Sequence, residues 1–364
     1  MIDYAALIHA SFALKNLYST TYFISIILCI IAITFFISSK KSNMYTAIQR
    51  IHDDKQEISR FGGFSILISI VFYFFIESEI VFFDYLKFIL ISFSPLFVIT
   101  LYEDIKQNTS SRLRLFFILI SSLIFLIQLS DLELPKIDAP FLEFISNNYF
   151  LQILFFSFCL AIVTNGMNLI DGVNGLVAAT TLSSLAALAF MANREVDTDF
   201  LSLIFFFFSF YFIFFLFNYP WGKIFMGDLG AYFSGFIIGG MTIIFYSRHP
   251  ELPTWGAVLL LFYPSFEVLF SIIRRYLKNK HPFQPDKNHL HTKLFYLVEH
   301  TNMRPLVSNA MILPFLTSLW ISPSFFIPWI YKSPVLILVA VFIMIALYTS
   351  LFYFLPNIPD DNKS

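Results

Sequence analysis

The sequence predicts an all-α, polytopic integral membrane protein. Of its 364 residues, 58% are hydrophobic and only 13% are charged, whereas about a quarter of the residues of a soluble domain are charged. The apolar residues form long runs, and a helix needs roughly 20 of them to cross the hydrocarbon core. Backbone groups in lipid must be satisfied inside helices or closed barrels, and the alternation typical of strands is absent, so we expect helical spans.

About eleven apolar stretches qualify as transmembrane helices, and a single membrane domain over residues 1–364 accounts for the whole chain. We find no internal repeat of the kind that many transporters carry, and no separate soluble domain. The expected spans are 22–39, 62–82, 87–102, 113–130, 149–165, 173–192, 199–217, 229–247, 255–273, 306–328 and 334–355.

The basic residues predict the orientation of the chain in a cell inner membrane. Residues 1–21 lack a small-residue cleavage site, and Lys40-Lys41 follows the first span, so this span is expected to stay as an anchor. With the N-terminus outside and the C-terminus cytoplasmic, most of the 23 Lys and Arg residues lie in the cytoplasm, as the positive-inside rule requires. The six that remain outside are Lys15, Lys87, Lys136, Arg194, Arg248 and Lys332.

The chain contains only two cysteines, Cys29 and Cys159, and both lie inside apolar runs. A disulfide framework or a cysteine zinc cluster is therefore not expected. Nothing in the composition points to a nucleic-acid partner.

Short polar segments interrupt the apolar chain, and in the predicted orientation all of them are cytoplasmic. Ionisable groups next to hydrocarbon are costly, which makes them functional-site candidates. One active site on the cytoplasmic face is the economical interpretation. Its loops are expected near 40–61, 103–112, 165–175, 218–230 and 274–305.

The first segment is Glu103-Asp104, at the end of the third expected span and close to basic residues. Two adjacent carboxylates can hold Mg²⁺ or act as a base, since hard divalent cations prefer oxygen ligands. The alternative is a polar stop at the membrane surface.

In the second segment Asn165, Asn168 and Asp171 are spaced by three. On a continuing helix they would share one face and would bind a polar ligand. Gly172 and Gly175 would then allow a turn or a close approach. The alternative is a hydrogen-bonded seam between helices.

The third segment places Asp228 between glycines, just before a new apolar helix. At a helix N-terminus the backbone amides and the dipole favour phosphate, which the carboxylate could join through Mg²⁺. The alternative is a simple N-cap.

The fourth segment is a basic loop that contains Arg274, Arg275, His289 and His291. Such side chains donate to phosphate oxygens and concentrate anionic substrates. The alternative is an ordinary positive-inside loop. Two histidines without a further soft ligand are a weak zinc signal.

Taken in order, these motifs resemble those of the polyprenyl-phosphate N-acetylhexosamine-1-phosphate transferases, a glycosyltransferase family 4 type. The matching features are Gly62-Gly63, the acidic pair with its following Arg112-Leu113, the pattern Asn-x-x-Asn-x-x-Asp-Gly-x-x-Gly-Leu at 165–176, Phe-Met-Gly-Asp at 225–228, and Arg274-Arg275 followed by His-Pro-Phe and His-x-His.

The resemblance implies transfer of an amino-sugar 1-phosphate from a UDP-sugar to undecaprenyl phosphate, with Mg²⁺, or alternatively Mn²⁺, and release of UMP. GlcNAc-1-phosphate is favoured because the chain has His-Leu-His where the peptidoglycan-precursor branch more usually has three histidines. The product would initiate a lipid-linked envelope glycan such as O-antigen. The enzyme would work on the cytoplasmic face of the membrane, with a homodimer as one option.

The resemblance also implies roles for individual residues. Asp228 would bind the metal, and Asp104, with Glu103, would activate the acceptor or support the metal. The substrate-binding and diphosphate-loop positions are Asn168, Asp171, Asn174, Asn218, Phe225, Arg275, His289 and His291.

Three positions depart from the usual family pattern: Glu103, Asn174 and Glu267 stand where the family more often has Asp. Glu keeps the charge of Asp but moves it by one methylene, and Asn adds hydrogen-bond donors.

Two alternatives to the transferase remain open. One is an ion-coupled transporter, whose binding groups should lie near the bilayer midplane, and the other is an inactive homologue.

Overall fold

Helices make up most of the chain that the structure, a computed structural model, describes. The described residues are 19–39, 46–48, 57–77, 82–129, 132–279, 288–299 and 305–358. The elements in order are α2 (Thr20–Ser38), β1 (Thr46–Ile48), β2 (Glu57–Ser59), α3 (Gly62–Ile76), α4 (Phe83–Lys106), α5 (Ser111–Gln128), the short 3-10 helix η1 (Pro140–Leu142), α6 (Glu143–Ser146), α7 (Tyr149–Leu169), α8 (Leu176–Arg194), α9 (Thr198–Asn218), α10 (Gly227–Arg248), α11 (Trp255–Leu260), α12 (Phe262–Leu277), α13 (Leu290–Glu299), α14 (Pro305–Phe315), α15 (Thr317–Trp320), α16 (Ser322–Ile330) and α17 (Pro334–Phe354).

Eight of the described helices are long and apolar enough to cross a membrane, or nine if one bent pair counts as a single span. The chain is thus a polytopic helical membrane protein, as predicted, but the count of eleven spans is not confirmed. The second expected span, 62–82, forms only the 15-residue α3. The spans expected at 255–273 and 306–328 are broken.

Proline explains where the span expected at 255–273 breaks. α11 ends at Leu260 and α12 begins at Phe262. Pro264 has no N–H to donate to the carbonyl of Leu260, and its ring crowds that carbonyl, so the helix cannot run through unchanged. In the second break, 309–315 and 318–330 meet at an angle of 48°.

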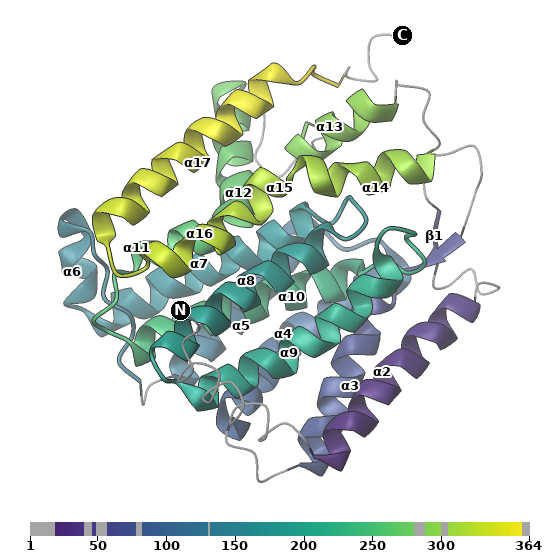
Figure 1. Cartoon of the computed structure of the whole chain (residues 1–364), viewed down its shortest axis with the longest axis horizontal. Helices are drawn as coiled ribbons and strands as arrows, with labels where there is room; N and C mark the ends of the chain where they lie inside the picture. The colour runs from purple at the N-terminus through teal and green to yellow at the C-terminus, as the bar shows by residue number, and fades with distance from the viewer. Residues whose placement is uncertain are drawn as a thin grey trace, which may run out of the picture.

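The helix α10 forms the centre of the bundle, and α2 and α17 lie at its periphery (Figure 1). Every residue of α10 before Arg248 is buried, whereas 17% of the residues in the apolar window of α2 and 28% of those in that of α17 are buried. A close contact between α3 and α10 needs glycine, because a Cβ on Gly63 would lie 2.1 Å from the Cα of Gly230. Small residues allow such backbone contact in membrane bundles.

A small antiparallel sheet departs from the purely helical prediction. In it Ala47 pairs with Ile58. Each strand has three residues, too few for alternation to be visible in the sequence. The end of β2 also binds the loop before α10, because the N–H of Phe225 donates to the carbonyl of Ser59 at 2.8 Å. The sheet thus fixes Arg60 beside the N-terminus of α10.

Candidate active site

The N-terminus of α10 is closed by a carboxylate from another helix. Asp104, in the last turn of α4, accepts hydrogen bonds from the backbone N–H of Asp228 at 2.8 Å and of Leu229 at 2.9 Å. The first N–H groups of a helix have no partner within the helix, and a carboxylate there also stabilises the dipole. The N-cap alternative for Asp228 is therefore wrong, since Asp228 lies in the first helical turn and Asp104 supplies the cap.

Two arginines hold the side chain of Asp228. Arg60 Nη2 lies 2.7 Å from Asp228 Oδ1, and Arg114 Nη1 lies 2.6 Å from Oδ2. Arg60 also approaches Asp104 Oδ1 at 3.5 Å. The backbone at Gly227 has φ +76°, a conformation that favours glycine, and a Cβ there would lie 2.1 Å from the carbonyl oxygen of Arg60. Asp228 is thus held close to both cations.

Glu103 lies at the edge of this cluster. Its Oε2 accepts hydrogen bonds from the N–H and the hydroxyl of Thr109, at 2.8 and 2.5 Å. Its Oε1 is 3.7 Å from Arg114 Nη1. Glu103 therefore orders the turn between α4 and α5 and places Arg114 toward Asp228.

Asp171 follows the end of α7 and does not continue it. The helix ends at Leu169, and Ile170 caps it, so only Asn165 and Asn168 of the expected helical face lie on a helix. Desolvation in the enclosed loop raises the pKa of Asp171 to about 7; the attraction of Arg60 lowers it, and repulsion by Asp228 raises it further. Asp171 therefore belongs electrostatically to the Asp228 cluster.

A second network holds His289. Its Nδ1 lies 3.1 Å from Glu267 Oε1 and 3.4 Å from the hydroxyl of Ser271. The other oxygen of Glu267 accepts a hydrogen bond from the hydroxyl of Tyr348 at 2.6 Å. Glu267 is fully buried, and a buried carboxylate needs such partners. It therefore acts as the anchor for the histidine loop.

His291 connects the two networks. Its ring lies parallel to that of His289, with centroids 5.8 Å apart, and a Cβ on Gly172 would lie 2.7 Å from its Nε2. Burial lowers the pKa of His291 to about 4, against the pull of Glu267 and with added repulsion from His289. His291 is therefore neutral near pH 7, and its buried Nδ1 has no hydrogen-bond partner among the residues that the structure describes.

The expected uridine-pocket residues have structural contacts. Asn218 is buried: its Nδ2 donates to the carbonyl of Ile224 at 2.7 Å, and its Oδ1 accepts from the N–H of Gly175 at 2.5 Å. Asn174 receives support from Asn309, whose Oδ1 accepts the hydrogen bond of the Asn174 N–H at 2.8 Å. The carboxamide of Asn218 thus joins two loops, whereas the buried Nδ2 of Asn174 has no hydrogen-bond partner within the described part of the chain.

Other expected site residues lie around this core. Phe225 is half-buried, and its carbonyl accepts the N–H of Gly62 at 3.0 Å. Arg275, also half-buried, is in the last turn of α12. Of the expected active-site loops, most of 40–61 and parts of 274–305 lie outside the described residues.

The sequence prediction missed several residues of the site, above all Arg60 and Arg114. Arg60 lies two residues before the Gly62-Gly63 motif, and this closeness is the signal in the sequence that could have pointed to it. Arg114 lies one residue beyond the quoted Arg112-Leu113. Asn309 and Tyr348 gave no recognisable motif.

The acidic cluster fits a divalent cation in its chemistry. Its four carboxylates, Glu103, Asp104, Asp171 and Asp228, against two guanidiniums leave two formal negative charges when all are ionised. Within the described residues no three of these carboxylates bring oxygens together as a ligand set. Mg²⁺ commonly binds through one or two carboxylates plus substrate phosphates, so a full protein ligand set is not required.

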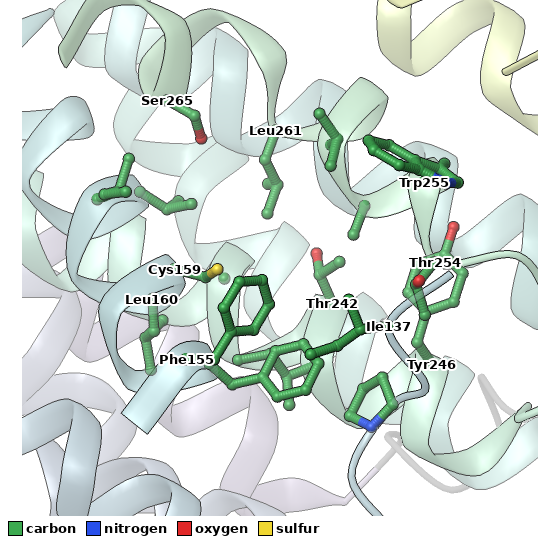
Figure 2. A pocket seen from close by; sticks show the side chains of 18 of the residues that line it. Ile137, Phe155, Cys159, Leu160, Thr242, Tyr246, Thr254, Trp255, Leu261 and Ser265 are labelled. Atoms are coloured by element: carbon green, nitrogen blue, oxygen red, sulfur yellow. The ribbon is translucent and has the colours of Figure 1, made fainter. Parts of the chain in front are cut away.

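An apolar cavity of about 270 Å³ lies between α7, α10, α11 and α12 (Figure 2). Phe155 and Cys159 line it from α7, and Thr242 and Tyr246 line it from α10. Ser265 and Leu269 extend its lining along α12 on either side of Glu267 in the sequence. The cavity suits an apolar chain.

Comparison with known proteins agrees with this geometry. Residues 86–246 match the family model described as Glycosyl transferase family 4, a segment that contains Glu103, Asp104, Asp171 and Asp228. The matched segment makes up less than half of the chain, and it is similar to glycosyl transferase family 4. The fold places the matched acidic residues at one end of the bundle.

Three relatives cover parts of the chain. A Bacillus subtilis protein named probable undecaprenyl-phosphate N-acetylglucosaminyl 1-phosphate transferase is 35% identical over 36% of this chain and 37% of its own. A Thermotoga maritima protein named undecaprenyl-phosphate alpha-N-acetylglucosaminyl 1-phosphate transferase is 30% identical over 35% of this chain and 38% of its own. A Lactobacillus gasseri phospho-N-acetylmuramoyl-pentapeptide-transferase is 30% identical over 49% of this chain and 54% of its own. The aligned part thus spans between about a third and about half of these relatives.

Proposed function

We propose that this chain is a glycosyl transferase family 4 enzyme. It transfers an N-acetylhexosamine-1-phosphate, with GlcNAc-1-phosphate as the first choice, from its UDP-sugar to undecaprenyl phosphate and releases UMP. The observation that carries the proposal is the ring of charge around Asp228, in which carboxylates and arginines converge on a helix N-terminus. Two relatives named for undecaprenyl-phosphate N-acetylglucosaminyl 1-phosphate transfer support the substrate. The product would start a lipid-linked envelope glycan such as O-antigen.

The reaction depends on position and charge more than on covalent chemistry. An oxygen of the acceptor phosphate attacks the phosphorus that carries the sugar, the bond from that phosphorus to the bridging oxygen breaks, and UMP leaves with the electron pair. Arg60 and Arg114 each have five N–H donors, so each can bind a phosphate oxygen while it still contacts Asp228. His291, neutral near pH 7, would act as a hydrogen-bond donor or acceptor beside Gly172.

In this proposal Asp228 would hold Mg²⁺, or alternatively Mn²⁺, with support from Asp104, and the ion would neutralise charge on the diphosphate. Asp104 keeps the end of α10 in place through two backbone hydrogen bonds. Its oxygens have further lone pairs, so it can still support the metal or the incoming acceptor. Glu267 positions His289 over the same end of the bundle.

The orientation of the bundle in the membrane follows from the positions of its basic residues. Five basic residues assigned to the outside, Lys87, Lys136, Arg194, Arg248 and Lys332, fall at the other helix ends or in the loops there. We therefore place the active site at the cytoplasmic face of the inner membrane. The acceptor's isoprenoid tail would enter the bundle from the lipid, and the apolar cavity beside α12 would take part of it.

The direct test uses the purified full chain in detergent with undecaprenyl phosphate, Mg²⁺ and a panel of UDP-sugars, and measures UMP and the lipid product by mass. We expect UMP release with UDP-GlcNAc and its loss in Asp228→Asn. If no sugar gives either product, the transferase proposal fails. If UMP forms without sugar-1-phosphate on the lipid, the chain is a hydrolase of the donor instead.

A further inference from the structure

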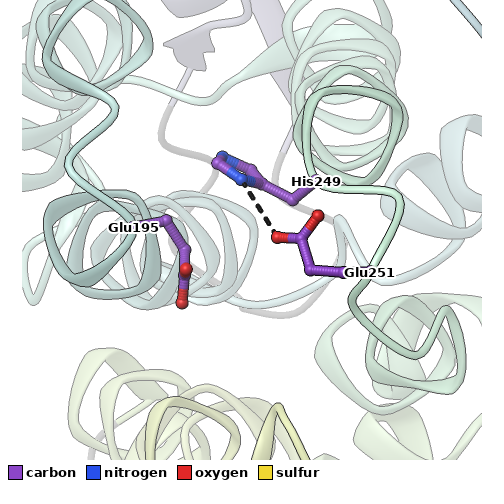
Figure 3. A group of neighbouring side chains, drawn as sticks. All are labelled: Glu195, His249 and Glu251. Carbon is purple, nitrogen blue, oxygen red and sulfur yellow. Dashed lines mark ion pairs between the residues drawn. The ribbon is translucent and has the colours of Figure 1, made fainter.

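A separate group of polar side chains lies at the opposite end of α10. Glu195 caps the C-terminus of α8, His249 caps that of α10, and Glu251 follows in the next loop (Figure 3). One ligand atom from each lies within 4.8 Å of the others. At 1.5 Å per residue, the 21 positions from Asp228 to His249 place this group about 32 Å from Asp228 along the helix. The proposed transfer reaction does not use it.

Asp197 fixes the orientation of the His249 ring. Its Oδ2 lies 3.2 Å from His249 Nε2 and 2.6 Å from Arg248 Nε, and its Oδ1 lies 2.6 Å from Arg248 Nη2. The carboxylate is buried and cannot donate, so His249 Nε2 must carry the proton. This carboxylate and histidine pair is the arrangement that supports metal-binding histidines in proteins.

With Nε2 directed at Asp197, Nδ1 is the ring nitrogen of His249 that faces Glu251. Nδ1 and Glu251 Oε1 face each other at 3.6 Å, too far apart for a good hydrogen bond. Ligands of a tetrahedral zinc ion, each about 2.0–2.1 Å from the metal, lie roughly 3.3 Å apart, so the observed separation needs little adjustment.

We infer that Glu195, His249 and Glu251 bind a zinc ion at this face. Imidazole with carboxylates is a ligand set that suits Zn²⁺ rather than Mg²⁺ or Ca²⁺. Glu195 Oε1 receives Tyr331 and, at 2.8 Å, Lys332 Nζ, which leaves Oε2 for the ion. Water completes the tetrahedron.

The carboxylates around the site favour a cation, and a bound ion would connect several helices. Two of the ligands, Glu195 and His249, border a hollow of about 600 Å³ that is also lined by the carboxylates Glu133, Asp197 and Asp199 and by Arg248, with Lys332 Nζ 2.8 Å from Glu195. An ion bound here joins the ends of α8 and α10, and through Tyr331 and Lys332 it also joins the turn between α16 and α17. Zinc would therefore stabilise this end of the bundle.

The test is zinc binding to the purified full chain in detergent after treatment with a chelator. We expect one zinc per chain, and a loss of affinity of about tenfold or more in Glu251→Gln and in His249→Gln. The matched control is Asp199→Asn, which removes one carboxylate charge from the hollow beside the site but no ligand, and it should bind zinc as the wild type does. Asp228→Asn should also leave this binding unchanged, which separates the site from the active site.

Two further results decide between coordination and simple attraction. Co²⁺ in place of zinc should give the visible absorption of a tetrahedral ion, and Glu251→Gln should abolish it. The inference is overturned if Asp199→Asn and Glu251→Gln weaken binding equally, or if neither ligand variant changes it. In that case the carboxylates only attract cations from solution, and added zinc would leave the melting temperature unchanged.

Discussion

Asp104 and Asp228 meet through the backbone: a side-chain oxygen of the first accepts the N–H of the second at 2.8 Å. The contact joins residues that are 124 positions apart. Asp104 caps the N-terminus of α10, and Asp228, in the first turn of α10, contacts Arg60 and Arg114. The position of the proposed metal ligand therefore depends on a residue in a different span.

Replacing Asp104 should separate its capping role from its charge. Asp104→Ala removes both hydrogen bonds to the end of α10, and the loss of a helix cap costs about 1–2 kcal/mol. Asp104→Asn keeps one of the two accepting oxygens and turns an NH₂ group toward the other N–H, so it should lose part of the cap's stabilisation and should release UMP more slowly. Melting in detergent and UMP release measure the two effects.

The matched control is Asp84→Ala, which removes an exposed carboxylate from the first turn of the same helix α4. It should leave both quantities unchanged. Equal melting temperatures for Asp104→Ala and Asp84→Ala would contradict the capping role.

The arginine pair should be essential to turnover. Arg60→Ala or Arg114→Ala removes a positive charge beside Asp228 and beside the proposed diphosphate, and the loss of one such preorganised group costs about 10²-fold or more in rate. Lysine at either position keeps the charge but not the fork of N–H donors, so it should restore activity only in part.

Arg112→Ala is the control, because Arg112 is exposed and lies two residues from Arg114 on the same helix. Its rate of UMP release should stay near that of the wild type. If Arg112→Ala lowers activity as much as Arg114→Ala, a general loss of basic charge is the cause rather than the contact with Asp228.

The sequence predicts the kinds of residue in the site better than their contacts. The pattern of Asp228 among glycines correctly places it at the start of a helix. The cap comes from Asp104, on another helix, and local sequence cannot show such a pairing. Helical phase decides that Arg114 rather than Arg112 contacts Asp228, and a prediction of span ends that is uncertain by a few residues cannot resolve that phase.

The positions of the long apolar helices could be predicted from the sequence, but the breaks and ends of other helices could not. Uniform apolar runs such as α9 and α17 appear at the expected positions, because lipid favours them whatever their neighbours are. The break at Leu261 depends on Pro264, which a hydropathy average hides. The expectation that the helix α7 continues to Asp171 was wrong, because α7 ends at Leu169 and two nearby glycines allow the chain to turn.

Because of His291, the stability of the fold should fall as the pH is lowered below about 6.5. Burial lowers the pKa of His291 to about 4 from an ordinary value of 6.5, with Glu267 and His289 as its charged neighbours. Between these values the unfolded chain binds a proton that the folded chain does not, so stability falls as the pH drops from about 6.5 to about 4. Above 6.5 this group has no effect.

Melting temperatures measured across this range for the wild type and His291→Asn test the point, because Asn keeps a polar side chain that does not titrate. The variant should lose stability less steeply toward pH 4. Asp171 acts in the opposite sense, since its pKa is raised to about 7 in the fold, and Asp171→Asn should therefore steepen the decline. Parallel curves for wild type and His291→Asn would rule out the assigned role.

Filling the apolar cavity should weaken binding of the lipid acceptor without affecting the sugar donor. Cys159 lines this cavity from α7, and Cys159→Trp would occupy space proposed for the isoprenoid tail. Displacing two methylenes of the tail costs about 1.6 kcal/mol, or roughly a tenfold higher KM for undecaprenyl phosphate. Leu154→Trp, on the exposed side of the same helix, is the control and should leave KM unchanged. The KM for the UDP-sugar should be the same in all three proteins, and a short-chain isoprenoid phosphate that does not reach the cavity should bind Cys159→Trp as it binds the wild type. A KM for undecaprenyl phosphate that Cys159→Trp leaves unaltered would place the tail elsewhere on the bundle.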